Sequence, residues 1–154
     1  MKLGNGFAPV PEMVEAGINV CLGTDGAASN NTLNMFHEMS LLTLIHKGTH
    51  KTPVCIGAAE ALRMATVNGA KALGLEKTGE IKTGYKADLA ILDINTPSMV
   101  PRNNMLSSLT YSANGSEVDT TIADGEILME GRELKTVDLE RVLYETNRMM
   151  ERLS

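Results

Sequence analysis

The fold of this chain is decided by one stretch, Val20-Cys21-Leu22-Gly23-Thr24-Asp25-Gly26-Ala27-Ala28-Ser29-Asn30-Asn31. Its first residues belong to a short apolar run over 18–22, which predicts a buried β-strand. Gly-Thr-Asp-Gly then stops the strand and leaves one carboxylate, Asp25, at its C-terminal end. Ser-Asn-Asn is typical of helix N-caps, and a helical pattern follows it. The sequence therefore predicts a strand, an acidic tip, a loop and a helix.

Two interpretations of Asp25 are open at this point. Parallel α/β architectures place their chemistry at the C-terminal ends of strands, so Asp25 is a candidate metal ligand or proton acceptor. Asp-Gly is also a common turn pair, and spacing alone favours a purely structural turn. Asn30 and Asn31 have two interpretations as well, because they either cap the next helix or face a substrate near Asp25.

The composition limits the class of protein. The chain has 154 residues, enough for one domain of ordinary size, with 43% hydrophobic and 21% charged residues. Its net charge of −5 and the lack of a basic block argue against nucleic acid or an anionic membrane surface as a partner. No apolar run approaches the ~20 residues of a membrane span, and the first residues lack the apolar core of a signal peptide.

The two cysteines indicate a reducing compartment. Cys21 and Cys55 lie inside apolar runs, so we expect buried free thiols rather than a disulfide framework. A cytoplasmic location is the corresponding prediction.

The first half of the chain alternates helical and extended patterns. A Gly/Pro loop over 1–11 precedes a short helix over 12–16, which Gly17 closes. The next helix is expected over 32–47, ended by Gly48, and another begins at Thr52-Pro53. The expected buried face of that third helix consists of Ile56, Ala58, Ala59, Leu62 and Ala65. A break is expected between Thr66 and Gly69, followed by a short helix over 70–73.

From about residue 76 the pattern is punctuated by glycine and prone to β-structure. Strands are expected over 79–81 and 87–94, with a turn at 84–86 and one short element over 106–111. The clearest local signal is a hairpin of 118–123 and 126–129 around Asp124-Gly125. A short connection over 132–135 leads to a helix over 138–153, whose apolar stripe needs a partner surface.

The histidines do not form a visible metal motif. His46 and His50 are four residues apart, but Gly48 is expected to break the helix between them. His37, like the other two, is expected to be an ordinary surface or helix-face residue. Cysteine pairs with zinc spacing, a phosphate-binding Gly-rich loop and a Gly-x-Ser-x-Gly turn are all lacking. A catalytic zinc needs about three protein ligands, and of these Asp25 alone stands out.

Taken together, these motifs resemble the C-terminal part of metal-dependent amidohydrolases, in the branch of the 5-methylthioadenosine/S-adenosylhomocysteine deaminases and the triazine chlorohydrolases. The resemblance covers the whole chain, and its most specific part is the eighth-strand motif that ends in Ser-Asn-Asn. The other matching segments are Met1-Lys2-Leu3-Gly4 with Ala8-Pro9-Val10-Pro11, the stretch from Met64 to Leu75, Gly79-Glu80-Ile81, the stretch from Gly84 to Leu89, and the stretch from Val118 to Gly125.

The resemblance implies an α/β fold, namely the C-terminal fragment of a (β/α)₈ barrel of a metal-dependent hydrolase. Residues 1–75 would supply the last barrel strand and helices, and residues 76–135 the C-terminal strands of a small composite β-sandwich. Residues 136–154 would form a helix that packs back on the barrel.

The resemblance also implies a chemistry. The family binds one divalent metal, commonly zinc, and Asp25 matches the eighth-strand residue that is both metal ligand and catalytic proton acceptor for the attacking water. The metal lowers the pKa of that water to about 7, and hydrolysis releases ammonia from an adenosine-type nucleoside. The substrate is thus a small molecule, and the residues that bind it are unknown.

The family's His-x-His pair, its other histidines and its catalytic glutamate have no counterparts here and would precede Met1. We therefore expect the chain alone to be inactive and to hold no metal tightly. One alternative is hydrolysis of another C–N or C–Cl bond of a heterocycle. Another is a non-catalytic fragment that self-associates through open strand edges or through its last helix.

Overall fold

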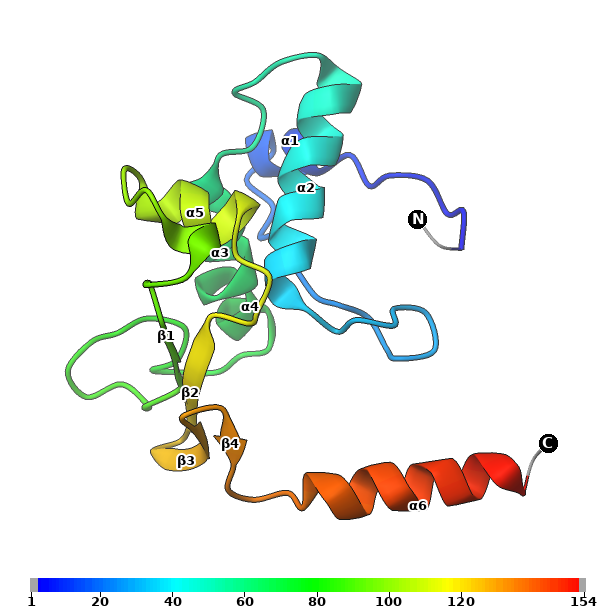
Figure 1. Cartoon of the computed structure of the whole chain (residues 1–154). Helices are drawn as coiled ribbons and strands as arrows, with labels where there is room; N and C mark the ends of the chain where they lie inside the picture. Colours follow the sequence, from blue (N-terminus) through cyan, green and yellow to red (C-terminus); the bar gives the residue numbers. More distant parts are fainter. Residues whose placement is uncertain (1–2, 153–154) are drawn as a thin grey trace. The chain divides into compact units, whose positions relative to one another are not determined.

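The structure is a computed structural model that describes residues 3–152 (Figure 1). The predicted α/β class is confirmed. The chain divides into two compact units, one made of the residues up to 85 with 94–117 and the other of 86–93 with the residues from 118 onward. Met1 and Lys2 of the first family motif, and Leu153 of the predicted last helix, lie outside the described residues.

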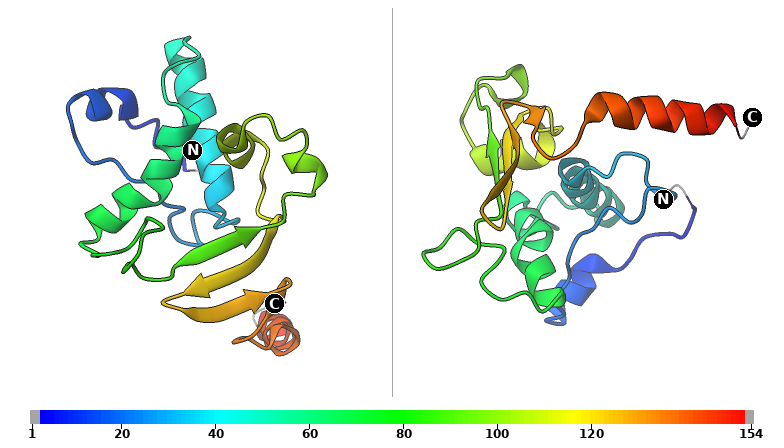
Figure 2. Two further views of the ribbon diagram at one scale, coloured as in Figure 1. Left: turned by 90° about the vertical axis from the view of Figure 1, so that its left-hand side faces the viewer. Right: turned by 90° about the horizontal axis from the view of Figure 1, so that it is seen from below.

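The first unit is helical. Its elements are α1 (Val10–Glu15), α2 (Met35–His50), α3 (Ala58–Ala65), α4 (Val67–Ala72), the 3₁₀ turn η1 (Pro97–Met99) and α5 (Met105–Tyr111). Helices α2, α3 and α5 pack against one another, and Figure 2 shows α2 beside α3 from two further sides. The buried hydroxyl of Thr110 on α5 donates to the Ala58 carbonyl at 3.4 Å, which joins α5 to the start of α3.

Helix α2 begins and ends later than the sequence indicates. Asn34 caps it by accepting from the backbone N–H groups of Phe36 at 3.0 Å and His37 at 3.2 Å. The helix then continues through Gly48 to His50, so the predicted end at Gly48 is wrong. A glycine inside a helix costs only about 1 kcal/mol, and the Thr49 hydroxyl, donating to the Ile45 carbonyl at 2.9 Å, supports the last turn.

The predicted helix start at Thr52-Pro53 is also wrong. Residues 51–57 form turns, and α3 begins at Ala58 after an extended Gly57. Ile56 is buried ahead of the helix, and Ala61 and Met64 form the buried face, whereas Ala59 is exposed. The predicted break at Thr66 is confirmed, and α4 starts three residues before the expected helix over 70–73.

The predicted strand over 18–22 is not formed. The segment is extended but half-exposed, and in the described part of the chain no strand pairs with it. Its polar groups bond to α3 and α4 instead: Leu22 N–H donates to the Met64 carbonyl at 2.9 Å, and the Asn68 side chain donates to the Val20 carbonyl at 2.7 Å. A parallel strand needs a neighbouring strand for its ladder, which explains why an apolar run alone does not produce one here.

The core of the first unit joins this segment to the helices. Val10, Ile56 and Met64 are buried together, and the partly buried side chains packed on them are Val14, Val20, Leu22, Leu42 and Cys55. Cys21 points the other way and is exposed. The expectation of two buried thiols is therefore wrong for Cys21, because it is Val20 and Leu22, its neighbours in the chain, that pack on the core.

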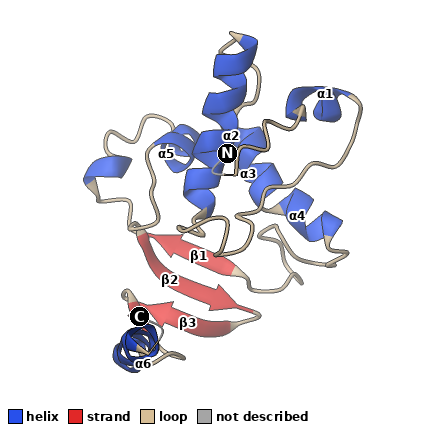
Figure 3. Ribbon diagram, turned by 90° about the vertical axis from the view of Figure 1, so that its right-hand side faces the viewer, coloured by secondary structure: helices blue, strands red, loops and turns tan. Residues whose placement is uncertain are grey.

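The second unit contains a four-stranded antiparallel sheet and one helix. Its strands, in the spatial order β1-β2-β3-β4, are β1 (Leu89–Leu92), β2 (Val118–Ala123), β3 (Glu126–Glu130) and β4 (Glu133–Leu134). Figure 3 shows the first three side by side. The predicted hairpin is confirmed, because Asp124 and Gly125 both adopt positive φ, 49° and 86°, between β2 and β3. The predicted connection over 132–135 contains the two residues of β4.

The predicted strand over 79–81 is wrong for a steric reason. Gly79 lies against α4, where an added Cβ would come within 3.1 Å of the Ala70 Cβ and the Val67 Cα. Gly79 therefore serves a close backbone approach, and Ile81 is left 89% exposed.

The last helix, α6 (Leu139–Glu151), begins where it was expected. Asp138 caps it by accepting from the Arg141 N–H at 2.9 Å. None of its residues is buried, and its apolar stripe is exposed, with Leu143 at 56%. That the helix packs back on a barrel, and that the chain divides at residues 75 and 135, remain predictions. No helix among residues 3–152 is long and apolar enough to cross a membrane.

Glu117 is a buried carboxylate of the first unit. It is fully buried and accepts from the backbone N–H groups of Asn114 and Gly115, each at 3.0 Å, and from the Ser98 hydroxyl. Burial opposes its charge, but these donors outweigh burial and hold the pKa of Glu117 below its ordinary value. The carboxylate closes the loop that follows α5.

We predict that Glu117→Ala lowers the free energy of unfolding by about 1–3 kcal/mol, because it leaves two buried N–H donors unpaired. Since the pKa of Glu117 is lowered by folding, its contribution is present above the ordinary value of 4.5 and is lost as the pH falls through the folded-state pKa. Urea unfolding at several pH values measures both effects. Glu126→Ala, at an exposed strand position, is the control, and equal stability of the two variants would contradict the prediction.

The continuity of α2 through Gly48 brings two histidines together. The rings of His46 and His50 are 5.8 Å apart, so the predicted separation of these residues by a helix break is wrong. His46 is buried, whereas His50 Nε2 lies 3.3 Å from Glu12 Oε1 on α1. The contact ties α1 to the last turn of α2.

We predict that the two rings titrate on opposite sides of the ordinary histidine value. The hydrogen bond with Glu12 raises the pKa of His50, and burial lowers the pKa of His46. The His50–Glu12 contact thus stabilises the fold while Glu12 is ionised and His50 is protonated. It is lost as the pH rises through the raised pKa of His50, and also as the pH falls through the lowered pKa of Glu12. In an NMR titration, Glu12→Gln is expected to lower the pKa of His50, and Glu60→Gln to leave it in place. If the pKa of His50 is the same in Glu12→Gln as in the wild type, Glu12 is not the group that raises it.

Candidate functional site

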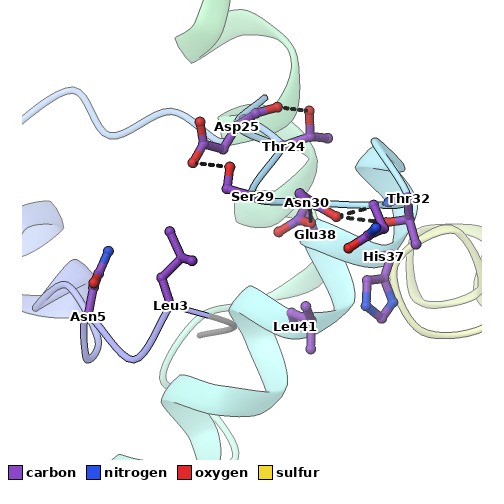
Figure 4. A pocket seen from close by; sticks show the side chains of 12 residues that line it. Leu3, Asn5, Thr24, Asp25, Ser29, Asn30, Thr32, His37, Glu38 and Leu41 are labelled. Carbon is purple, nitrogen blue, oxygen red and sulfur yellow. Dashed lines mark hydrogen bonds between the residues drawn. The ribbon is translucent and has the colours of Figure 1, made fainter. Parts of the chain in front are cut away.

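A pocket of about 390 Å³ lies in the first unit, at the loop that the sequence singles out (Figure 4). Its walls come from the N-terminal segment, from the loop ahead of α2 and from the start of α2. The lining residues are Leu3, Asn5, Gly23, Thr24, Asp25, Ser29, Asn30, Asn31, Thr32, His37, Glu38 and Leu41. The pocket gathers every polar residue of the Asp25 to Asn31 motif.

Asp25 is held at its two carboxylate oxygens. Its Oδ1 accepts from the Gly26 N–H and its Oδ2 from the Ser29 hydroxyl, both at 2.7 Å. The Ser29 bond and then the Gly26 bond lower the pKa of Asp25, so the exposed carboxylate is ionised at neutral pH. The backbone of Asp25 is left-handed, with φ of 60°, and the side chain lies on the pocket wall.

Asn30 fastens the same loop to α2. Its Nδ2 donates to Glu38 Oε1 at 2.6 Å, and its Oδ1 accepts from the backbone N–H and the hydroxyl of Thr32, both at 3.1 Å. The interpretation of Asn30 and Asn31 as helix caps is wrong, because Asn34 performs that role. Both asparagines line the pocket that Asp25 lines, as the other interpretation required.

Ser29, His37 and Glu38 are among the pocket residues that were not predicted as part of a site. Ser29 was interpreted as part of a helix N-cap and His37 as an ordinary surface or helix-face residue, and Glu38 was given no role, yet all three line the pocket. A usable signal exists in the sequence, since a helix that begins after an Asn-Asn loop presents its first turn back toward that loop. His46 and His50 lie at the other end of α2 and do not line the pocket.

The described residues supply one suitable metal ligand rather than a complete set. An ionised and accessible carboxylate suits a divalent cation, and Asp25 meets that condition. Among residues 3–152, however, no three His, Cys, Asp or Glu side chains gather in a way that would hold a metal ion. The residues at hand therefore fit a metal only as one contributor to a larger site.

Comparison with known proteins identifies relatives over nearly the whole chain. The model of the Amidohydrolase family matches residues 1–128. A 5-methylthioadenosine/S-adenosylhomocysteine deaminase of Acetivibrio thermocellus is 55% identical over 154 residues, which is 99% of this chain and 36% of that protein. A 5'-deoxyadenosine deaminase of Methanosarcina mazei is 50% identical over 99% of this chain and 35% of its own length.

Solved structures agree with these relatives. An adenosine deaminase from Xanthomonas campestris with bound zinc superposes with a TM-score of 0.94 at 34% identity, over 98% of this chain and 35% of that one. An atrazine chlorohydrolase from Arthrobacter aurescens in complex with zinc gives 0.87 at 30% identity, over 95% and 33%. The chain thus spans about a third of the length of the proteins it matches. Because the family match covers far more than half of the sequence, the chain belongs to the amidohydrolase family.

Proposed function

We propose that this chain contributes to a metal-dependent hydrolase that removes the amino group of adenosine-type nucleosides, with 5-methylthioadenosine and S-adenosylhomocysteine as substrates. The observation that carries the proposal is the ionised Asp25 at the wall of an open pocket, within the residues that the amidohydrolase family model matches. The relatives that are about half identical to this chain are named as deaminases of such nucleosides.

Asp25 has two roles in this proposal, as a metal ligand and as the catalytic proton acceptor. When bound, a zinc ion supplies Lewis-acid activation of water at neutral pH. In the overall reaction, water adds to the purine carbon that bears the amino group, and ammonia leaves. The Asp25 carboxylate, ionised and accessible, accepts the proton that the attacking water gives up.

The remaining ligands lie outside the described residues in this proposal. Zinc is the metal of choice because similar structures are described with bound zinc. With Asp25 as the one ligand among residues 3–152, we expect the 154-residue chain by itself neither to hold zinc tightly nor to turn over substrate.

A second candidate reaction is hydrolysis at a carbon that bears chloride. The similarity to an atrazine chlorohydrolase favours it. The two reactions share the metal and Asp25, and they differ in the leaving group.

The proposal extends to partners and location. A small-molecule substrate, rather than nucleic acid, fits the net charge of −5, and the two free cysteines fit a cytoplasmic protein. The isolated chain is proposed to self-associate, since the apolar stripe of α6 is exposed.

The activity is tested in a chimaera in which this chain replaces the matching 154 residues of the Acetivibrio thermocellus relative. We expect the chimaera to bind zinc and to release ammonia from 5-methylthioadenosine, while the chain alone does neither. Asp25→Asn is expected to lower kcat by about 10²–10⁴-fold and to reduce the zinc content. Asp124→Asn, in the hairpin turn of the second unit, is the control and retains both.

Full activity of Asp25→Asn would remove Asp25 from the mechanism. Release of chloride from a chlorotriazine without release of ammonia from the nucleoside would replace the deaminase by the second candidate.

Self-association is tested by light scattering of the chain over a range of concentrations. We expect a dimer or larger species, and Leu143→Glu is expected to shift it toward monomer because it places a charge in the apolar stripe of α6. Glu140→Gln, on the same helix, serves as the control and leaves the mass unchanged. A monomeric wild-type chain at high concentration would contradict the proposal.

A further inference from the structure

We infer that Glu38, Asn30 and Ser29 act in series as positioning residues that set the orientation of the Asp25 carboxylate. The inference rests on the role proposed for Asp25 above. It concerns three side chains to which neither the family match nor the names of the relatives assign a task.

The first link joins Ser29 to Asp25. The Ser29 hydroxyl is 2.7 Å from Asp25 Oδ2 and 3.1 Å from the Gly26 carbonyl, so its single hydrogen goes to the closer and charged acceptor. The Gly26 N–H holds the other oxygen, Oδ1, at 2.7 Å. Donors on both oxygens fix the plane of the carboxylate, whereas the Gly26 bond alone leaves it free to turn.

The second link joins Asn30 to α2. Ser29 and Asn30 both donate backbone N–H bonds to the Gly26 carbonyl, at 3.0 and 2.9 Å, so the two residues share one tight turn. The Asn30 side chain then reaches Glu38 Oε1 at 2.6 Å. Glu38 lies in the first turn of α2, a 16-residue helix packed on α3 and α5.

Hydrogen bonds rather than packing hold this loop. Residues 25–28 are all exposed, as are residues 31–33, so no apolar side chain of the loop is buried. Asn30 satisfies both ends of its amide, with Thr32 on one side and Glu38 on the other. The helix therefore holds the loop through Glu38, and the loop holds Asp25 through Ser29 (Figure 4).

Such an arrangement has a functional consequence. Removing a group that orients a metal ligand typically lowers metal affinity or activity by about 10–100-fold. Glu38 does not touch Asp25, so its effect must pass through Asn30 and Ser29. Glutamine at position 38 keeps the oxygen that accepts from Asn30, whereas alanine removes it.

The first experiment uses the 154-residue chain and needs neither metal nor substrate. NMR follows the side-chain amide of Asn30 and the carboxyl carbon of Asp25 in Glu38→Ala, Glu38→Gln and the control Glu126→Ala. We expect Glu38→Ala to shift both signals and to speed hydrogen exchange of the Asn30 amide. Glu38→Gln and the control are expected to match wild type. An Asp25 signal unchanged in Glu38→Ala, in a variant with wild-type helix content, would overturn the inference.

The second experiment measures kinetics in the chimaera described above. Glu38→Ala and Ser29→Ala are expected to lower kcat by about 10–100-fold with little change in KM, and to weaken zinc binding. Glu38→Gln and Ser29→Thr, which keep the acceptor and the hydroxyl, are expected to restore both.

The two failures are distinguishable. Activity that survives Asp25→Asn removes the role proposed for Asp25 but leaves the NMR result intact. Equal losses in Glu38→Ala and Glu38→Gln, or in Ser29→Ala and Ser29→Thr, overturn the positioning role while Asp25 keeps its own.

Discussion

The point at which α2 begins is the constraint on which the first unit depends. Asn34 sets it, because its side chain accepts from two N–H groups at the start of the helix. The same side chain donates to the Asn114 carbonyl at 2.6 Å, and Gly115 lies so close that a Cβ there would be 3.3 Å from Asn34 Nδ2. One asparagine thus joins the start of α2 to the loop that Glu117 closes. Had the helix started at residue 32, the loop that contains Asp25 and Asn30 would be shorter.

Local chemistry predicts some elements of this chain well. The Asp124-Gly125 hairpin, the cap at Asp138 and the break at Thr66 were all expected, because in each case the determining residues are neighbours in sequence. The predicted helix end at Gly48 and the predicted helix start at Thr52 were wrong. The hydrogen bond of Thr49 and the burial of Ile56 outweigh the local preference of glycine to end a helix and of Thr-Pro to begin one. The strand over 18–22 failed for a further reason, as strand formation depends on a partner that a sequence pattern does not reveal.

The sequence predicts some residues of the candidate site and misses others. The position of Asp25 at the end of an apolar run singled it out, and the family motif gave it a role. That Ser29 and Asn30 point back toward Asp25 and Glu38 depends on the turn at Gly26, which residue types alone do not specify. His37 and Glu38 line the pocket from the start of α2, which Asn34 caps.

Because Cys21 is exposed, the segment over 18–22 can be labelled by thiol-reactive reagents. Its thiol is open to solvent four residues before Asp25, whereas Cys55 is partly shielded by the core. We therefore expect a thiol-reactive dye to react faster at Cys21 than at Cys55. A strand or subunit that docks along this segment would slow the labelling of Cys21 and leave the labelling rate of Cys55 unchanged. Cys55 thus serves as the internal reference. The ratio of the two labelling rates then reports whether the exposed side of the segment is covered.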